Sequence, residues 1–368
     1  MCGSSSLKMQ NIFIRVDSGI EIGIGHMMRC FALAEILKGM NFEVNFISKK
    51  LNENIYNFIV KKGYKVHIIP DNNQNKKHNS FSTNSTSKKI IENDAIETMK
   101  IIMKNNDKPS WVLVDHRDLD IQWETILREC VERIIVIDDL ANKKHDCDLL
   151  IDQNLYEEMD KRYINLVPKN CKKLLGPKYA LLRPEFFELR KNLIKNIKQL
   201  RNILISFGGS DPSNETCKVL EAIKILNIKN IKVDVVVGSV NPHKEKIKQI
   251  CSSIPNTTFY CDVDKIGVLM TKADLAIGAG GSTTWERCCL GLPSMVSIIS
   301  EDQLECTETM GEKDYIINLG RAKKLTVKDY VEKIRNININ KLQIISKLNL
   351  EIVDGKGCQR IASVIKLL

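Results

Sequence analysis

One histidine stands where a catalytic base is expected. His26 follows Gly23 and Gly25, at the predicted start of a helix, and the hydrophobic run Asn11–Val16 precedes them. The glycines permit a sharp turn, and the positive end of the helix disfavours the charged imidazolium form. A neutral imidazole can take a proton from water, so His26 is our candidate general base. The competing interpretation is a helix cap or a packing residue, the commoner role of a lone histidine at such a position.

A second histidine follows another predicted strand. His116 comes directly after Asp115, at the end of the run Trp111–Val114. The carboxyl ends of parallel strands meet at one edge of a sheet, so His116 could line the same site as His26. The remaining histidines lie in a strand run, a polar insert, a lysine-rich stretch and a loop, which favour no catalytic role.

Two glycine-rich turns in the second half predict an anion-binding site. The strand Asn202–Phe207 leads into the first turn, and the strand Asp274–Ile277 leads into the second. Backbone N–H groups in such turns, with the positive ends of the helices that follow, bind phosphates. One such turn could be only a tight connection, whereas two in one domain favour a diphosphate. The predicted binding residues are Gly208, Gly209, Ser210, Gly280, Gly281, Ser282 and Thr283, with Glu286 one helical turn beyond Ser282 as an acceptor for ribose hydroxyls.

The elements that position these residues alternate along the whole chain. Short β-branched runs, almost continuously apolar, are typical of buried parallel strands, and helical stretches separate them. The pattern starts again after Arg183, which predicts two α/β domains of Rossmann type that face each other across a cleft. Further strands are expected at Glu43–Ile47, Lys65–Ile69, Arg133–Ile137, Leu149–Ile151, Lys232–Val237, Ser294–Ile298 and Tyr315–Leu319, and helices at His26–Met40, Glu185–Gln199 and Asn340–Leu368.

Composition narrows the functional class. The 368 residues carry a net charge of +10, but lysines are scattered and aromatic residues make up only 6%, so no nucleic-acid partner is expected. No apolar stretch is long enough to span a membrane and no signal peptide is evident, which predicts a cytoplasmic protein. The twelve cysteines never form a C-x-x-C pair and are interpreted as reduced packing thiols. The polar stretch Asp71–Asp94 is expected to be a mobile surface insertion.

Several motifs together resemble one enzyme family. The chain is similar to the UDP-2,4-diacetamido-2,4,6-trideoxy-β-L-altropyranose hydrolases of pseudaminic acid biosynthesis, relatives of the nucleotide-sugar glycosyltransferases with two facing Rossmann-like domains (the GT-B fold). The resemblance spans roughly Phe13 to Ile361. It rests on Arg15-Val16-Asp17 and on the segments 22–30, 137–141, 146–154, 175–183, 206–212, 278–286 and 353–357.

The resemblance implies a reaction and a division of labour. His26 matches the family's proposed base, and the two glycine turns match its UDP site. Water would attack the anomeric carbon with inversion and UDP would leave, with no cofactor and no metal. The implied domains are 9–190 (sugar site and base), 191–350 (UDP site) and 351–368, a C-terminal helix that is a candidate to pack on the first domain. A monomer is expected. The sugar-side residues are Arg15, Asp17, Gly23, Gly25, His116, Arg117, Asp302 and Gln303.

Two departures from the family pattern concern the sugar. Arg117 stands where the family often has tyrosine, and Asp302 replaces an amide. The identity of the sugar therefore follows less firmly than the reaction. A glycosyltransferase and a hydrolysing UDP-sugar 2-epimerase on the same scaffold remain alternatives, and the epimerase would require further acids such as Asp17, Asp115 or Asp138.

Overall fold

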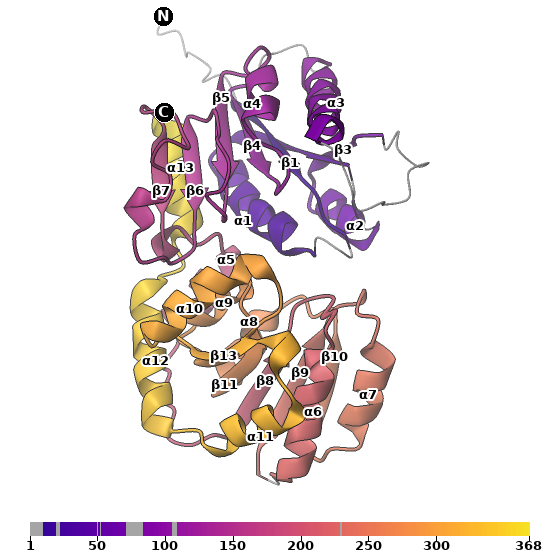
Figure 1. Cartoon of the computed structure of the whole chain (residues 1–368), viewed down its shortest axis with the longest axis vertical. Coiled ribbons are helices and arrows are strands. Elements are labelled where there is room, and N and C mark those ends of the chain that lie inside the picture. Colours follow the sequence, from indigo (N-terminus) through magenta and orange to yellow (C-terminus); the bar gives the residue numbers. More distant parts are fainter. Residues whose placement is uncertain are drawn as a thin grey trace, which may run out of the picture. The chain divides into compact units, whose positions relative to one another are not determined.

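The chain forms two compact α/β units (Figure 1). The computed structural model describes residues 10–19, 23–49, 51, 53–70, 84–104, 109–228 and 230–368, apart from the side chains of 84–87. The first unit contains the residues through Gln153, then Glu158–Leu175 and Cys358–Leu368. The second contains Asn154–Glu157 and Gly176–Gly357. Residues 176–190, which the sequence analysis gave to the first domain, thus belong to the second unit, and the C-terminal helix belongs to the first.

The first unit is built on a seven-stranded sheet in which every paired strand is parallel to its neighbour. The strand order is β3-β2-β1-β4-β5-β6-β7. Its strands are β1 (Gln10–Val16), β2 (Phe42–Ser48), β3 (Lys65–Ile68), β4 (Trp111–Asp115), β5 (Arg133–Ile137), β6 (Leu149–Asp152) and β7 (Lys172–Leu175). Its helices are α1 (Gly25–Gly39), α2 (Glu53–Lys61), α3 (Asn84–Met103), α4 (Ile121–Leu127) and α13 (Gly357–Leu367), with a short 3₁₀ helix at Met159–Lys161.

The second unit repeats the plan with six parallel strands in the order β10-β9-β8-β11-β12-β13. Its strands are β8 (Asn202–Ser206), β9 (Lys232–Val237), β10 (Thr257–Cys261), β11 (Leu275–Ala279), β12 (Ser294–Ile298) and β13 (Ile317–Arg321). Its helices are α5 (Pro184–Lys191), α6 (Glu215–Leu226), α7 (Lys244–Ser252), α8 (Ile266–Lys272), α9 (Thr283–Cys289), α10 (Leu304–Glu312), α11 (Val327–Arg335) and α12 (Ile339–Ile352), with 3₁₀ turns at Pro177–Tyr179, Glu301–Gln303 and Ala322–Lys324.

The predicted strands are confirmed, with small differences at their ends, but two edge strands were missed. Central strands such as β4 and β11 are buried at every position, so their sequences are continuously apolar. Strand β7 reads KKLL and exposes its lysines, and no residue of β10 is fully buried. Edge strands have one free side in water, so their residues lack the apolar signal that marks a buried strand.

Two predicted helices are shorter or broken. The helix expected at Glu185–Gln199 ends at Lys191. Beyond it, Lys195 donates to the carbonyls of Met270, Thr271 and Ala273 at the end of α8. The terminal stretch forms two helices, α12 and α13. Between them Gly355 has a φ of 81°, in the left-handed region where a continuing helix is excluded.

Part of the polar insertion is ordered and buried. Helix α3 starts at Asn84, so nearly half of the stretch 71–94 is helical rather than mobile. Asp94 is only 6% exposed and pairs with Arg15 inside the first unit. The residues 71–83 lie outside the described part of the chain.

Both sheets reverse their strand order at the first strand of the unit. In the first unit β1 pairs with β2 on one side and β4 on the other. In the second unit β8 pairs with β9 and β11. The loops that leave the two neighbouring strands diverge at such a point and open a crevice at their carboxyl ends, where ligands bind in α/β proteins. The candidate residues of each unit follow these strands.

Two further expectations concern cysteines and membranes. Every cysteine that the structure describes is a free thiol, and all of these are buried except Cys261. Across the described residues, no helix combines the length and the apolar character needed to cross a bilayer.

Candidate functional site

His26 lies at the first turn of α1, next to the carboxyl end of β1. The helix begins at Gly25, with Ile24 as a cap that contributes no side-chain hydrogen bond. Gly23 has a φ of 78°, and its N–H donates to the carbonyl of Gly19 at 2.8 Å. A positive φ of this size favours glycine, so this residue sets the sharp turn that leads into the helix. Gly23 thus forms the sharp turn that the sequence indicated, whereas Gly25 is the first residue of the helix.

Asp115 orients the His26 ring. The Nδ1 atom of His26 lies 2.7 Å from Oδ1 of Asp115, the last residue of β4. With Nδ1–H donating to the carboxylate, Nε2 carries the lone pair. No described residue makes a hydrogen bond with Nε2, and the side chain is 15% exposed. An imidazole held by a carboxylate on one nitrogen, with the other available to water, has the arrangement of a general base.

A buried arginine holds Asp115 in turn. Arg29, one turn after His26 on the same helix, donates from Nε to Oδ2 and from NH2 to Oδ1 of Asp115, both at 2.7 Å. Its NH1 donates to Asp139 at 2.7 Å. Burial alone would raise the pKa of Asp115, but the charge of Arg29 and the hydrogen bonds from Arg29 and His26 outweigh it and hold the pKa well below the usual range. Asp115 is therefore an ionised, fixed acceptor for His26.

His116 has both ring nitrogens engaged. Its Nδ1 accepts the backbone N–H of Asp118 at 3.1 Å, so Nε2 carries the proton and faces Asp17 Oδ2 at 3.2 Å. Neither nitrogen is left to accept a proton from water. The side chain is 16% exposed and can contact a ligand, but its hydrogen bonds do not suit a base.

Arg15 and Asp17 form an interior network rather than a ligand surface. The Arg15 side chain is fully buried and donates to Asp17 at 2.6 and 3.1 Å and to Asp94 at 2.7 and 3.1 Å. Asp17 also accepts from the Ser48 hydroxyl and the N–H of Lys49. The sugar-binding role predicted for Arg15 is not supported, because its donors are occupied inside the unit. Asp17 is 5% exposed and its oxygens already hold these partners.

At the first glycine turn of the second unit, an acidic side chain already binds the amino end of the helix that follows, α6. Gly208 has a φ of 86° and is exposed, and Gly209 and Ser210 are half-buried. The carboxylate of Asp211 accepts the N–H groups of Glu215 and Thr216 at 3.0 and 2.9 Å. The positive end of α6 is thus already neutralised by an acid. Any anion at this turn would meet the N–H groups of residues 208–210, not the helix end.

The second turn keeps free donors. Oε1 of Gln303 accepts the N–H groups of Gly280 at 3.3 Å and Ile299 at 3.2 Å, which joins this turn to the loop after β12. The N–H groups of Gly281, Ser282 and Thr283 have no acceptor in the part of the chain described. Gln303, predicted on the sugar side, therefore contacts the second glycine turn. Its neighbour Asp302 is half-buried, and Arg117 is exposed after β4.

Glu286 is the acid of this turn. Its Oε1 lies 3.7 Å from NH2 of Arg183, which also contacts Glu185 at 3.0 Å. Burial raises the pKa of Glu286, and the charge of Arg183 opposes that effect. The side chain is 20% exposed, so its carboxylate can reach a ligand. Trp285 beside it is buried, as expected for a core residue.

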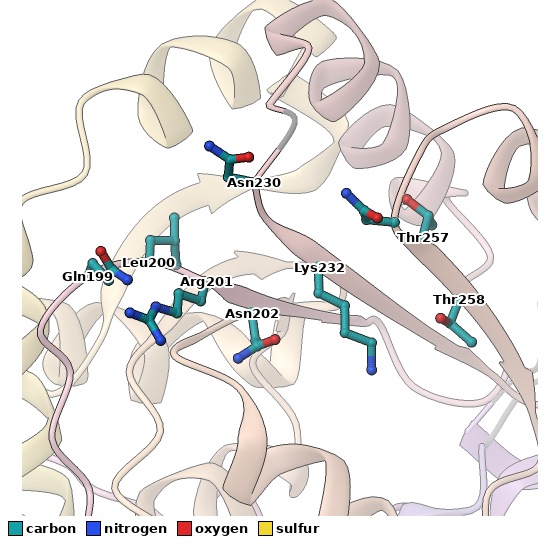
Figure 2. A pocket seen from close by; sticks show the side chains of 9 residues that line it. Gln199, Leu200, Arg201, Asn202, Asn230, Lys232, Thr257 and Thr258 are labelled. Atoms are coloured by element: carbon teal, nitrogen blue, oxygen red, sulfur yellow. The ribbon is translucent and has the colours of Figure 1, made fainter.

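A sizeable pocket lies elsewhere, at the opposite edge of the second sheet. Its volume is about 900 Å³, and it is lined at the amino ends of β8, β9 and β10 by polar residues that include Asn202, Lys232 and Thr257. Figure 2 shows these side chains around the first residues of the strands. Neither glycine turn contributes to it. Ligands of this type of sheet bind at the carboxyl edge, so we do not assign the pocket to the substrate.

Sequence reasoning missed the partners of the predicted residues. Asp115, Arg29 and Asp94 were not assigned to the site, although Arg29 lies at i+3 from His26 and therefore on the same helical face. Asp94 could not be found this way, because its contact with Arg15 joins residues 79 positions apart. Among the described residues, no group of three or more histidine, cysteine or acidic side chains is arranged to hold a metal ion.

Comparison with known proteins finds distant relatives at 24–27% sequence identity. No protein-family model matches the chain. An uncharacterised protein of Methanocaldococcus jannaschii, MJ1062, is 27% identical over 94% of the chain, which spans 64% of that protein's length. The spore coat polysaccharide biosynthesis protein SpsG of Bacillus subtilis is 25% identical over 97% of the chain and 98% of its own. A UDP-2,4-diacetamido-2,4,6-trideoxy-β-L-altropyranose hydrolase of Campylobacter jejuni is 24% identical over 76% of the chain and 88% of its own.

Solved structures share the fold at low sequence identity. MurG of Acinetobacter baumannii has a TM-score of 0.65 at 11% identity and covers 97% of this chain and 100% of its own. CalG4, the calicheamicin glycosyltransferase, has a TM-score of 0.62 at 10% identity, with 98% of each chain covered. A putative UDP-N-acetylglucosamine 2-epimerase of Listeria monocytogenes has a TM-score of 0.59 at 13% identity, with coverages of 97% and 95%. The predicted fold class, two Rossmann-like domains of GT-B type, is confirmed.

Proposed function

We propose that the chain is a nucleotide-sugar hydrolase that cleaves a UDP-linked diacetamido-trideoxy sugar at its anomeric C–O bond. The observation that carries the proposal is the pair formed by His26 and Asp115, with Nδ1 of the ring fixed at 2.7 Å and Nε2 left to a water molecule. The similarity to the hydrolase of Campylobacter jejuni supports the same reaction and the same substrate class, which would serve pseudaminic acid biosynthesis.

The chemistry needs only one base. Nε2 of His26 takes a proton from water as the water oxygen bonds to the anomeric carbon and the bond from that carbon to the phosphate oxygen breaks. The pair of electrons leaves with UDP, and attack opposite the leaving group inverts the anomeric centre. UDP is a good leaving group, so the N–H groups of the two glycine turns suffice to stabilise the charge that develops on it.

The alternatives on the same scaffold are a glycosyltransferase and a hydrolysing 2-epimerase. The epimerase requires additional acids, and the acids near His26 are engaged. Asp115 is bound by Arg29, Asp17 by Arg15, and Asp138 accepts the N–H groups of Leu140 and Ala141. This favours hydrolysis over the elimination that an epimerase performs first.

The deciding experiment uses a panel of UDP-sugars in H₂¹⁸O. We expect ¹⁸O in the released sugar and none in UDP, which defines C–O cleavage by water, and NMR of the fresh product should show the inverted anomer. Label in UDP would mean attack at phosphorus and would refute the proposal. A 2-epimeric product would support the epimerase, and turnover that depends on an added acceptor would support the transferase.

A further inference from the structure

Arg287 lies beneath the second glycine turn and joins its two ends. The residue is 2% exposed. Its NH2 donates at 2.8 Å both to the carbonyl of Ala279, where β11 ends, and to the hydroxyl of Thr284, where α9 begins. A Cβ on Gly278 would lie 2.9 Å from NH1 and 2.1 Å from the carbonyl oxygen of Ser206. Only glycine at that position lets the guanidinium and the neighbouring strand come this close.

Arg287 forms no ion pair with a described residue, although the charge of its neighbour Glu286 favours the protonated guanidinium. No described residue places a carboxylate within ion-pairing distance of its guanidinium, and Nε has no hydrogen-bond partner there. Its chain neighbour Glu286 faces Arg183 instead. Burial lowers the pKa of Arg287 to about 10, so the group still carries its proton at neutral pH. A buried charge without an ion-pair partner destabilises a fold, so a role in folding alone does not account for this arginine.

Three free donors belong to the turn that Arg287 holds at both ends. The N–H groups of Gly281, Ser282 and Thr283 find no acceptor among the described residues. A positive charge behind a row of unpaired N–H groups attracts an anion, because both act on the same partner in a medium that screens little.

We propose that Arg287 is a positioning residue for phosphate binding. It holds the turn 279–284 in shape and supplies the positive charge that a bound diphosphate neutralises. The inference rests on the proposed function, since it assigns this turn to the diphosphate of UDP. It implies that the arginine contributes to the affinity for the phosphates and not to that for the uridine.

The test compares the binding of UDP and uridine by calorimetry in the full-length protein. Arg287→Met should weaken the affinity for UDP by about 10- to 100-fold and leave the affinity for uridine unchanged. The dependence of UDP affinity on salt concentration should become shallower. Arg287→Lys should recover part of the loss because it keeps the charge. The matched control is Arg190→Met. Arg190 donates to the carbonyl of Cys289, at the carboxyl end of α9, and to that of Leu350 in α12. Removing its guanidinium should change neither affinity.

Each outcome has one meaning. Equal losses for UDP and uridine in Arg287→Met would show that the residue only supports the fold of the domain, and unchanged UDP affinity would overturn the inference while leaving the proposed function intact. A wild-type protein that binds no UDP would refute both. If Arg287→Met does not fold, Thr284→Val removes the hydroxyl that holds the guanidinium while keeping the side-chain volume, and it should show the same selective loss for UDP.

Discussion

The two units share a strand order but treat buried positive charge in opposite ways. In the first, Arg15 contacts Asp17 and Asp94, and Arg29 contacts Asp115 and Asp139. In the second, Arg287 contacts only a carbonyl and a hydroxyl. A network with balanced charges fixes the direction of a side chain such as His26. A buried cation without a counter-ion leaves its attraction available to a ligand. The comparison suggests that the first unit orients a reacting group and the second attracts an anion.

The largest effect should come from His26→Ala. Turnover should fall by ~10²–10⁴-fold because, among the described residues that follow β1 and β4, no other histidine has an unengaged ring nitrogen, and UDP affinity should stay within twofold. UDP release measures turnover and calorimetry measures binding. His243→Ala, on the loop before α7, is the control and should behave as the wild type. If turnover and UDP affinity fell together, His26 would not act in the chemical step alone, and the proposed functional difference between the units would be wrong.

The next largest effect should be the loss of stability when a buried ion pair of the first unit is broken. Asp94→Ala leaves Arg15 with one carboxylate and removes the acceptor of Trp123 Nε1 at 3.0 Å, so we expect a loss of about 3–5 kcal/mol in the free energy of unfolding. Glu43→Ala breaks the exposed pair with Lys65 in the same sheet and should cost at most about 1 kcal/mol. Chemical denaturation measures both variants. Similar losses would mean that burial of the pair is not what stabilises this network.

A third prediction tests the glycine turn of the second unit. A Cβ at Gly280 would meet Oγ1 of Thr307 at 2.4 Å, so Gly280→Ala should displace the turn and weaken the affinity for UDP by about tenfold. Thr307→Ala removes that oxygen, and the double variant should recover affinity in a double-mutant cycle. Gly39→Ala, where a Cβ meets nothing within 4 Å, is the neutral control. Without recovery in the double variant, the steric explanation for Gly280 would be wrong.

The sequence predicted the strands and the turns because both have local signals. Continuous apolar runs mark β4 and β11, and glycines after β1, β8 and β11 mark the turns that carry the candidate residues. Long-range pairing has no such signal. Asp94 was assigned to a mobile insertion because its neighbours are polar, yet its contact with Arg15 closes a loop of 79 positions. The same limit explains why Arg15 was taken for a ligand residue, since burial of a charge depends on a partner that local sequence does not reveal.

The smallest effect is a pH dependence that belongs to the first unit. His145 is 5% exposed, and its Nδ1 lies 2.6 Å from Oε1 of the buried Glu124. Burial lowers the pKa of His145, but the hydrogen bond and charge of Glu124 outweigh it, so the pKa in the folded state is raised. A raised pKa stabilises the fold fully below the unfolded value of about 6.5, and this contribution disappears as the pH rises through the folded value.

His145→Gln should therefore remove part of the fall in stability that follows as the pH rises above the unfolded value of about 6.5. Chemical denaturation in a Trp285→Phe background measures this, because the fluorescence then reports on Trp111 and Trp123 of the first unit. His243→Gln, in the second unit, should leave the pH profile of the first unit unchanged. If His145→Gln has the wild-type profile, the Glu124 pair does not titrate with folding.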